Sequence, residues 1–254
     1  MPSKQHHRGR HPEDDGLFAP GQVPRLAKAV ADLSWLLTRE YSRVSALKLV
    51  GDHFQLALRG RMAVDRCACS DASLALRRAR EVPMDRLRGE SLIVDGYNIL
   101  ITAESALANG VLLRGRDGCI RDMASLHGSY RRVEETLPAV ARIGETLAAL
   151  APERVFWYFD APVSNSGRLT AFLRAHAEAA RYPWHVALAP NPDKLLAQSP
   201  HIVLTSDSWI LDRAARWANL TAQVLRDLGM EARVLELAGN QDAPERQPGS
   251  GCSS

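Results

Sequence analysis

The stretch Leu92-Ile93-Val94-Asp95-Gly96-Tyr97-Asn98 decides how most of this chain folds. Three consecutive apolar residues are typical of a short strand that is buried on both faces, and the Asp-Gly step that follows ends it. Buried strands of this kind belong to parallel sheets that helices cover on both sides. The sequence therefore predicts an α/β domain that opens with residues 92–94.

Four further apolar runs resemble this first strand. They lie at residues 155–159, 186–188, 202–204 and 234–237. Between the runs, apolar side chains recur at helical spacing over residues 137–148, 169–176, 210–218 and 220–228. Such alternation predicts a three-layer α/β/α domain with a parallel sheet of about five strands. We place this domain at residues 90–239.

The residues before this domain show no strand pattern. Helices are predicted over residues 23–37, 45–50, 56–64 and 70–82. Residues 21–89 are therefore expected to form a small all-helical domain. The flanking segments, residues 1–20 and 240–254, offer little to bury and are expected to be disordered tails.

The net charge of +3 is divided unevenly along the chain. Residues 1–90 carry 16 Lys or Arg against 11 Asp or Glu, which leaves +5. Residues 91–254 carry 16 against 18, which leaves −2. A basic face on the helical domain would suit the phosphate backbone of a nucleic acid, and an ordinary solvated surface explains the same charge equally well.

Composition excludes several classes of protein. No apolar run approaches the roughly 20 residues that cross a bilayer, and the first residues lack the apolar core of a signal peptide. The four cysteines suit reduced thiols better than a disulfide framework. We therefore expect a cytoplasmic protein with no membrane partner. Gly-x-Gly-x-x-Gly, Walker and Gly-x-Ser-x-Gly motifs do not occur, which argues against dinucleotide, P-loop and α/β-hydrolase sites.

Three of the expected strands end in a carboxylate. Asp95 follows the first strand, Asp160 follows residues 155–159, and Asp207 comes just after residues 202–204. Ligands of open parallel sheets bind beyond the carboxyl ends of the strands, so these groups should meet at one edge. Carboxylates drawn together repel one another unless a cation offsets them, and hard divalent ions prefer oxygen ligands. The pattern predicts a Mg²⁺ or Mn²⁺ site.

Asp193, after the strand at residues 186–188, is a candidate fourth ligand. Each acid also has a purely structural interpretation. Asp207 can cap a helix over residues 209–218, and Asp95 can hold a turn. Asp193 can interact favourably with a helix dipole from the first turn of a helix. Either interpretation fits one acid alone, but three acids at equivalent strand ends favour the metal site.

Three motifs carry a resemblance to a known family. Residues 92–99 read Leu-Ile-Val-Asp-Gly-Tyr-Asn-Ile, residues 157–161 read Trp-Tyr-Phe-Asp-Ala, and residues 203–207 read Val-Leu-Thr-Ser-Asp. In order and spacing they resemble the signature strand ends of PIN-like nucleases, especially the NYN branch. The resemblance implies a PIN-like fold and a ribonuclease that depends on Mg²⁺ or Mn²⁺. The metal ligands that it implies are Asp95, Asp160, Asp207 and Asp193.

This resemblance covers most of residues 91–237. NYN proteins usually carry an Ala-Asp pair on a helix ahead of the third motif, whereas here Asp193 follows a proline. We expect Asn98 to orient the metal or the scissile phosphate. The whole chain, with Leu-Lys-Leu-Val-Gly-Asp at residues 47–52 and Gly-Arg-Asp-Gly at residues 115–118, also resembles an uncharacterised prokaryotic family that pairs the two domains.

A polar stretch at residues 114–134 gives the best clue to a substrate. Arginine binds phosphate through planar bidentate contacts, and aromatic rings stack on unpaired bases. Residues 164–167 can present backbone N–H groups to a phosphate at a helix N-terminus. The predicted RNA-binding residues are Arg114, Arg116, Arg121, His127, Tyr130, Arg131, Asn165 and Ser166. A solvated helix face with ordinary Arg–Glu pairs is the competing interpretation.

Together these observations predict a metal-dependent ribonuclease whose helical domain helps to hold single-stranded or structured RNA. The alternative is a catalytically inactive PIN-like protein that binds RNA or acts as an adaptor. A phosphotransferase or phosphatase with Asp95 as nucleophile ranks lower, because the second acid that such enzymes carry two residues later is absent.

Overall fold

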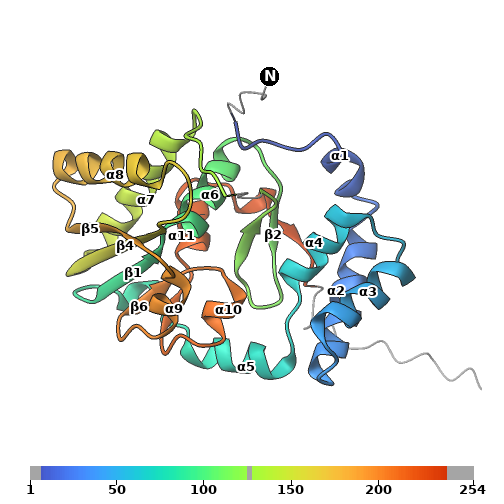
Figure 1. Cartoon of the computed structure of the whole chain (residues 1–254). Helices are drawn as coiled ribbons and strands as arrows, with labels where there is room; N and C mark the ends of the chain where they lie inside the picture. The colour runs from blue at the N-terminus through green and yellow to red at the C-terminus, as the bar shows by residue number, and fades with distance from the viewer. Residues whose placement is uncertain (1–6, 125–127, 239–254) are drawn as a thin grey trace, which may run out of the picture.

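The computed structural model describes residues 7–124 and 128–238. Its main sheet has five parallel strands in the order β5-β4-β1-β6-β7 (Figure 1). The strands are β1 (Ser91–Asp95), β4 (Arg154–Asp160), β5 (Trp184–Ala189), β6 (Ile202–Leu204) and β7 (Trp217–Ala218). The predicted α/β architecture with a five-stranded parallel sheet is thus confirmed.

Helices cover both faces of this sheet. Leu92 and Val94 of β1 belong to the core of one face and Ile93 to that of the other, because successive strand side chains point to opposite sides. The first face is covered by α6 (Gly96–Leu107), α7 (Thr136–Leu150), α8 (Ser166–Ala180) and α11 (Leu220–Asp227). The second is covered by α9 (Pro192–Ala197) and α10 (Ser208–Leu211).

The edge strand β7 corrects two predictions. The helix expected over residues 209–218 ends at Leu211, and Trp217 and Ala218 pair with β6 instead. Trp217 is fully buried and donates its indole N–H to the carbonyl of Arg77 at 2.8 Å. Tertiary burial of this large side chain overrides the helical pattern of the surrounding alanines. Residues 234–237, expected in the main sheet, belong to a different sheet.

That second sheet lies between the two parts of the molecule (Figure 1). Its order is β3-β2-β8, with β2 (Leu112–Arg114), β3 (Ile120–Asp122) and β8 (Leu235–Glu236). Leu112 packs with Leu225 of α11, whereas Leu113 faces the opposite way, into the core of the N-terminal helices. The small sheet therefore joins the α/β part to the helical part.

The N-terminal part is helical, as predicted. It contains α1 (Asp14–Leu17), α2 (Val23–Thr38), α3 (Arg43–His53), α4 (Leu58–Cys67), α5 (Asp71–Arg80) and a 3-10 turn at Met84–Arg86. Ser42 and Ser70 cap α3 and α5 with their side chains. The buried residues of α2, such as Leu26 and Leu33, share one core with Leu113 of the α/β part. The two parts are therefore packed as a unit.

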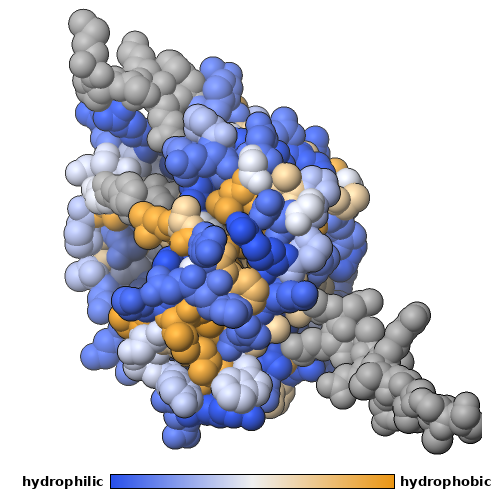
Figure 2. Space-filling view, turned by 90° about the vertical axis from the view of Figure 1, so that its right-hand side faces the viewer, coloured by the Kyte–Doolittle hydropathy of each residue, from blue (hydrophilic) through white to orange (hydrophobic). Residues whose placement is uncertain are grey.

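The outer face of the helical part keeps apolar side chains in contact with solvent (Figure 2). Val44 of α3 and Leu58 of α4 are exposed, and a groove of about 580 Å³ between α2 and α3 is lined by Trp35 and Leu49. Trp35 is 54% exposed and carries the guanidinium of Arg39 over its ring.

Residues 7–20, expected within a disordered tail, are ordered instead. Arg8 is buried and forms an ion pair with the fully buried Glu104 of α6. Asp14 is fully buried as well and receives the guanidinium of Arg59 from α4. Two buried ion pairs, each across a long sequence separation, fix this segment. Residues 240–254, predicted as the other tail, lie outside the described residues.

One buried network connects α5, the β2–β3 hairpin and the loop after β6. Asp117 in the hairpin receives Arg77 of α5 and Arg121 of β3. Arg77 also reaches Asp212, and Arg121 donates to the carbonyl of Ser206 at 2.8 Å. Burial by itself would raise the pKa of Asp117, but the two guanidinium groups lower it to about 2.

This network predicts a large loss of stability when one cation is removed. Arg121→Met should lower the free energy of unfolding by about 3–5 kcal/mol, because Asp117 keeps its buried charge with less compensation. Urea unfolding followed by circular dichroism measures the change. Arg226→Met is the control, since Arg226 forms an exposed pair with Glu231 and should matter by less than about 1 kcal/mol. Equal losses in the two variants would contradict the prediction.

Candidate active site

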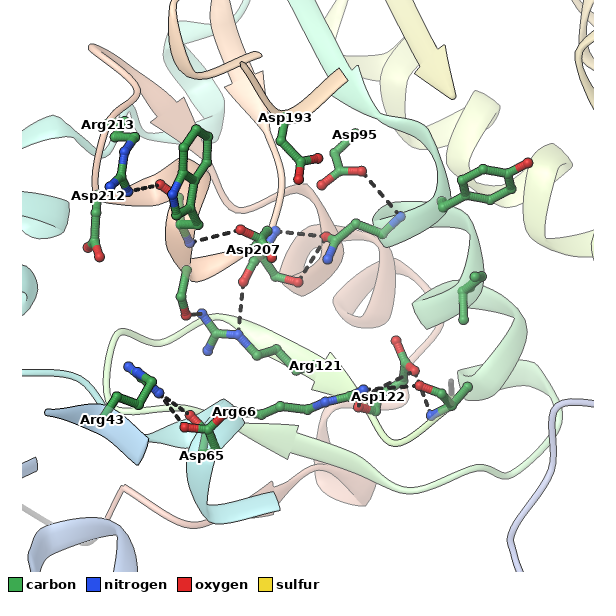
Figure 3. A pocket seen from close by; sticks show the side chains of 17 residues that line it. Arg43, Asp65, Arg66, Asp95, Arg121, Asp122, Asp193, Asp207, Asp212 and Arg213 are labelled. Carbon is green, nitrogen blue, oxygen red and sulfur yellow. Dashed lines mark hydrogen bonds and ion pairs between the residues drawn. The ribbon is translucent and has the colours of Figure 1, made fainter. Parts of the chain in front are cut away.

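A cavity of about 740 Å³ lies at the carboxyl ends of β1 and β6. The chain runs from β1 to β4 on one side and later returns to β6 on the other, so strand order reverses here. Open α/β sheets bind their ligands at such a point. Asp95, Asp193 and Asp207 lie on one side of the cavity, and Arg43 and Arg66 of the helical part lie on the other (Figure 3).

Asp95 is fixed at the end of β1 by local contacts. Its carboxylate accepts a hydrogen bond from the Thr205 hydroxyl at 2.8 Å and one from the backbone N–H of Asn98 at 3.5 Å, where it caps α6. The next residue must be glycine, because a Cβ on Gly96 would lie 2.6 Å from the carbonyl oxygen of Tyr158. The structural interpretation of Asp95 as a residue that holds this turn is therefore confirmed, and Asp95 also caps α6.

The same carboxyl group is electrostatically unusual. Burial raises the pKa of Asp95 to about 7, and the nearby carboxylates of Asp207 and Asp193 add to this effect, although the hydrogen bond from Thr205 opposes it. A cap that served only the helix would gain from being ionised. The raised pKa therefore reflects burial first, with a smaller contribution from the two neighbouring carboxylates.

Asp207 lies opposite Asp95 across the ends of β1 and β6. Its carboxylate accepts hydrogen bonds from the backbone N–H groups of Trp209 and Ile210, at 2.8 and 3.1 Å, and caps the short helix α10. Asn98 accepts hydrogen bonds from both the backbone N–H and the hydroxyl of Ser206. Asn98 thus fixes the position of the residue beside Asp207.

Asp193 and Asp160 differ in their access to the cavity. Asp193 stands in the first turn of α9, which Asn191 caps, and it lines the cavity. Burial raises the pKa of Asp193, and Asp207 and Asp160 raise it further. Asp160, the last residue of β4, lies outside the cavity lining, and burial raises its pKa. The structure therefore brings Asp95, Asp193 and Asp207 into one cavity, with Asp160 close enough to Asp193 to affect its charge.

Asp193 is exposed and Asp95, Asp160 and Asp207 are half-buried, and in the described part of the chain these four acids lack the cationic partners that the buried acids have. Elsewhere Asp14, Glu104 and Asp117 are each neutralised by arginine. Across residues 7–124 and 128–238, no Lys, Arg or His nitrogen lies within 4.0 Å of the carboxylates of the four acids Asp95, Asp160, Asp193 and Asp207. Clustered carboxylates of this kind resist ionisation until a cation joins them.

The donors suit a hydrated divalent ion. In the described part of the chain, no three Asp, Glu, His or Cys side chains gather closely enough to enclose a metal. Mg²⁺ usually takes only one or two protein carboxylates and keeps several waters. Asp95 and Asp207, with Asp193 beside them, offer such a set of oxygen donors.

The predicted RNA-binding residues are mostly placed elsewhere. Arg121 lines the cavity, but its guanidinium is held by Asp117 and is therefore a structural group. Arg114 pairs with Glu236, and Arg116 pairs with Asp71. His127 lies outside the described residues. The competing interpretation, a solvated helix face, is wrong for residues 114–122, which belong to the β2–β3 hairpin. The Gly-Arg-Asp-Gly turn is the signal that could have revealed this hairpin.

The structure also contradicts the RNA-binding roles predicted for Tyr130, Asn165 and Ser166. Tyr130 is 1% exposed and donates its hydroxyl to Glu104, so its ring is inaccessible for stacking on a base. Asn165 donates to the carbonyl of Tyr130 at 3.0 Å, and Ser166 is buried. Arg131 is exposed, and its carbonyl accepts a hydrogen bond from Arg8.

Sequence reasoning missed several cavity residues, among them Arg43 of the helical part and Trp209 and Arg213 after β6. Their only sequence signal is the nearness of the last two to Asp207. Arg43 and Arg66 come from helices far away in sequence, and only the packed fold brings them to this edge of the sheet.

Comparison with known proteins locates the chain in a family. Residues 84–223 match the family described as "Domain of unknown function (DUF5616)". The chain belongs to the DUF5616 family. Residues 25–80 match a second family, "Protein of unknown function (DUF434)", so the two matches fit the predicted layout of a helical part followed by an α/β part.

One curated relative extends over both parts. The "Uncharacterized protein MJ0935" of Methanocaldococcus jannaschii is 28% identical over 186 residues, which cover 73% of this DUF5616 chain and 88% of the relative. No solved structure matches the chain. Among the described residues, none of the helices combines the length and the apolar character that crossing a membrane requires.

The raised pKa of Asp95 predicts a pH-dependent stability. Between about pH 4 and pH 7 the folded carboxyl keeps a proton that the unfolded chain releases, so the free energy of unfolding falls as pH rises, by up to about 1.4 kcal/mol per pH unit. Asp95→Asn cannot ionise. In EDTA, its stability relative to the wild type should therefore increase from about pH 5 to about pH 8.

Urea midpoints at the two pH values measure this difference. The control is Asp85→Asn, at an exposed carboxylate of the 3-10 turn, which should follow the wild type at both. A constant difference between Asp95→Asn and the wild type would contradict the assigned charge environment.

Proposed function

We propose that this DUF5616 protein is a metal-dependent ribonuclease of the PIN-like, NYN type. One observation carries the proposal. The carboxylates of Asp95, Asp193 and Asp207 share a cavity at the reversal point of a parallel sheet, and in the described residues no cation of the protein pairs with them. The three sequence motifs and the all-parallel sheet order support the PIN-like assignment.

Asp95 and Asp207, with Asp193, are the residues that would hold Mg²⁺ or Mn²⁺. Such an ion, when bound, activates water and stabilises the charge that develops on a phosphodiester. The chain keeps these carboxylates in place through Thr205 and through the N–H groups that open α10. Because Asp95 has a raised pKa, binding of the cation and loss of a proton are coupled, and activity should rise with pH.

The residues on the opposite wall of the cavity support the proposal that the substrate is a polyanion. Arg43 and Arg66 line it and belong to the helical part, although Arg43 is paired with Asp65 and Arg66 contacts Asp122. A strand of RNA between the acids and these arginines would contact both parts of the protein. The helical part would then help to position the phosphodiester rather than act as a separate module.

A second candidate function is RNA binding without hydrolysis. It is favoured by the spread of the carboxylates, since no three metal-binding side chains of the described residues enclose a common point. In that case the cavity would hold RNA and the acids would serve only as caps of α6 and α10.

Substitution of the acids tests the hydrolytic function. Asp95→Asn and Asp207→Asn should each reduce Mn²⁺-dependent cleavage of a labelled RNA by about 100-fold or more, because each removes a charge that holds the ion. Circular dichroism checks that both variants fold. Asp85→Asn should cleave like the wild type. Full activity of both cavity variants would overturn the proposal.

Metal binding can be measured separately from cleavage. Mn²⁺ at about 100 times its Kd should stabilise the wild type by about 2.7 kcal/mol and stabilise Asp207→Asn much less. Thermal unfolding with and without the ion measures the effect. If neither Mn²⁺ nor Mg²⁺ changes the wild-type transition while RNA still binds, the non-catalytic function is the correct one.

A further inference from the structure

Trp209 and Arg213 form a pair at the cavity that hydrolysis does not require. Both line the cavity, and Trp209 follows Asp207 by two residues. The guanidinium of Arg213 stacks 4.1 Å from the indole centroid and donates to the Trp209 carbonyl at 2.9 Å. The indole is nevertheless 44% exposed. It is thus an aromatic surface that an arginine covers on one face and that remains partly exposed.

The charge of Arg213 is also available. Of the four arginines that line the cavity, Arg43, Arg66 and Arg121 pair with carboxylates. Arg213 has no carboxylate within 4.0 Å among the described residues, and the neighbouring Asp212 pairs with Arg77. An exposed aromatic ring beside an unpaired guanidinium matches the two parts of a nucleotide, the base and the phosphate.

We propose that Trp209 and Arg213 form a nucleotide subsite in which the indole stacks on an unpaired base and the guanidinium binds the adjoining phosphate. The proposal rests on the proposed function and adds a preference for single-stranded RNA. In a duplex each base already stacks on its neighbours, so a base can reach Trp209 only from a single strand, a loop or an end. The subsite and Asp207 line the same cavity.

Binding of short RNA tests the stacking contact. All variants carry Asp95→Asn so that the RNA stays intact, and anisotropy of a labelled adenosine oligomer gives Kd in Mg²⁺. Trp209→Ala should weaken binding about tenfold or more, and Trp209→Phe should keep most of it. An oligomer of equal length and charge but without bases should bind the parent and Trp209→Ala with equal affinity. A perfect duplex with capped ends should also bind these two proteins with equal affinity.

Trp35 provides the matched control. It is an exposed tryptophan that also carries an arginine, Arg39, over its ring at 3.5 Å, but it lies on α2 outside the cavity. Trp35→Ala should leave the Kd of the adenosine oligomer unchanged. Equal weakening by Trp35→Ala and Trp209→Ala would overturn the subsite.

The salt dependence tests the phosphate contact. Arg213→Gln should weaken binding of the oligomers with and without bases alike. It should also reduce the slope of the logarithm of the binding constant against the logarithm of the salt concentration by about 0.7, the value for one phosphate contact on a single strand. An unchanged slope would overturn the role of Arg213.

Failure of the subsite and failure of the proposed function give different results. If the unmodified protein cleaves RNA but Trp209→Ala binds single strands as the parent does, the subsite is wrong and hydrolysis stands. If single strands bind through Trp209 but no divalent ion supports cleavage, the subsite stands and hydrolysis is wrong. If the parent binds no single-stranded RNA, the subsite is wrong.

Discussion

The arrangement of this protein depends on the ion pairs that the buried carboxylate of Asp117 forms with two arginines. This carboxylate holds Arg77 from the helical part and Arg121 from the β2–β3 hairpin. Through Arg121 the same network reaches the carbonyl of Ser206, next to Asp207. Because these charges are shielded from solvent, salt screens them little. The position of an acid in the cavity is thus set partly by a helix that lies far from it in sequence.

The distribution of arginines gives the cavity its character. The chain contains 32 Lys and Arg, which is more than enough to neutralise every buried acid. Asp14, Glu104 and Asp117 all receive one. At the ends of β1 and β6 the arginines of the described residues do not pair with the acids: Arg43 and Arg66 lie on the far wall, and Arg213 stacks on Trp209. Selective neutralisation of this kind leaves one place where negative charge is concentrated and where a cation from solution is favoured.

Sequence reasoning predicted the features whose signals are local. The first strand and the acids at the strand ends can each be read from a few adjacent residues. The strand β7 could not be predicted in this way, because this two-residue strand is defined by the burial of Trp217 against β6 and Arg77. Arg121 was assigned to a substrate because its sequence neighbours do not reveal that it is buried against Asp117. Asp193 reaches the cavity only through the packing of α9 across the sheet.

The shared core has a consequence for how such a protein can evolve. The two family matches meet between residues 80 and 84, yet Val111, Leu113, Met123 and Leu237 from beyond that boundary are buried among the N-terminal helices. A gene fragment that ended there would encode helices with a bare apolar side. Recombination that exchanged one half alone would lose the fit between the two surfaces. In this chain the two parts share one core, so changes on one side of that core must be matched by changes on the other.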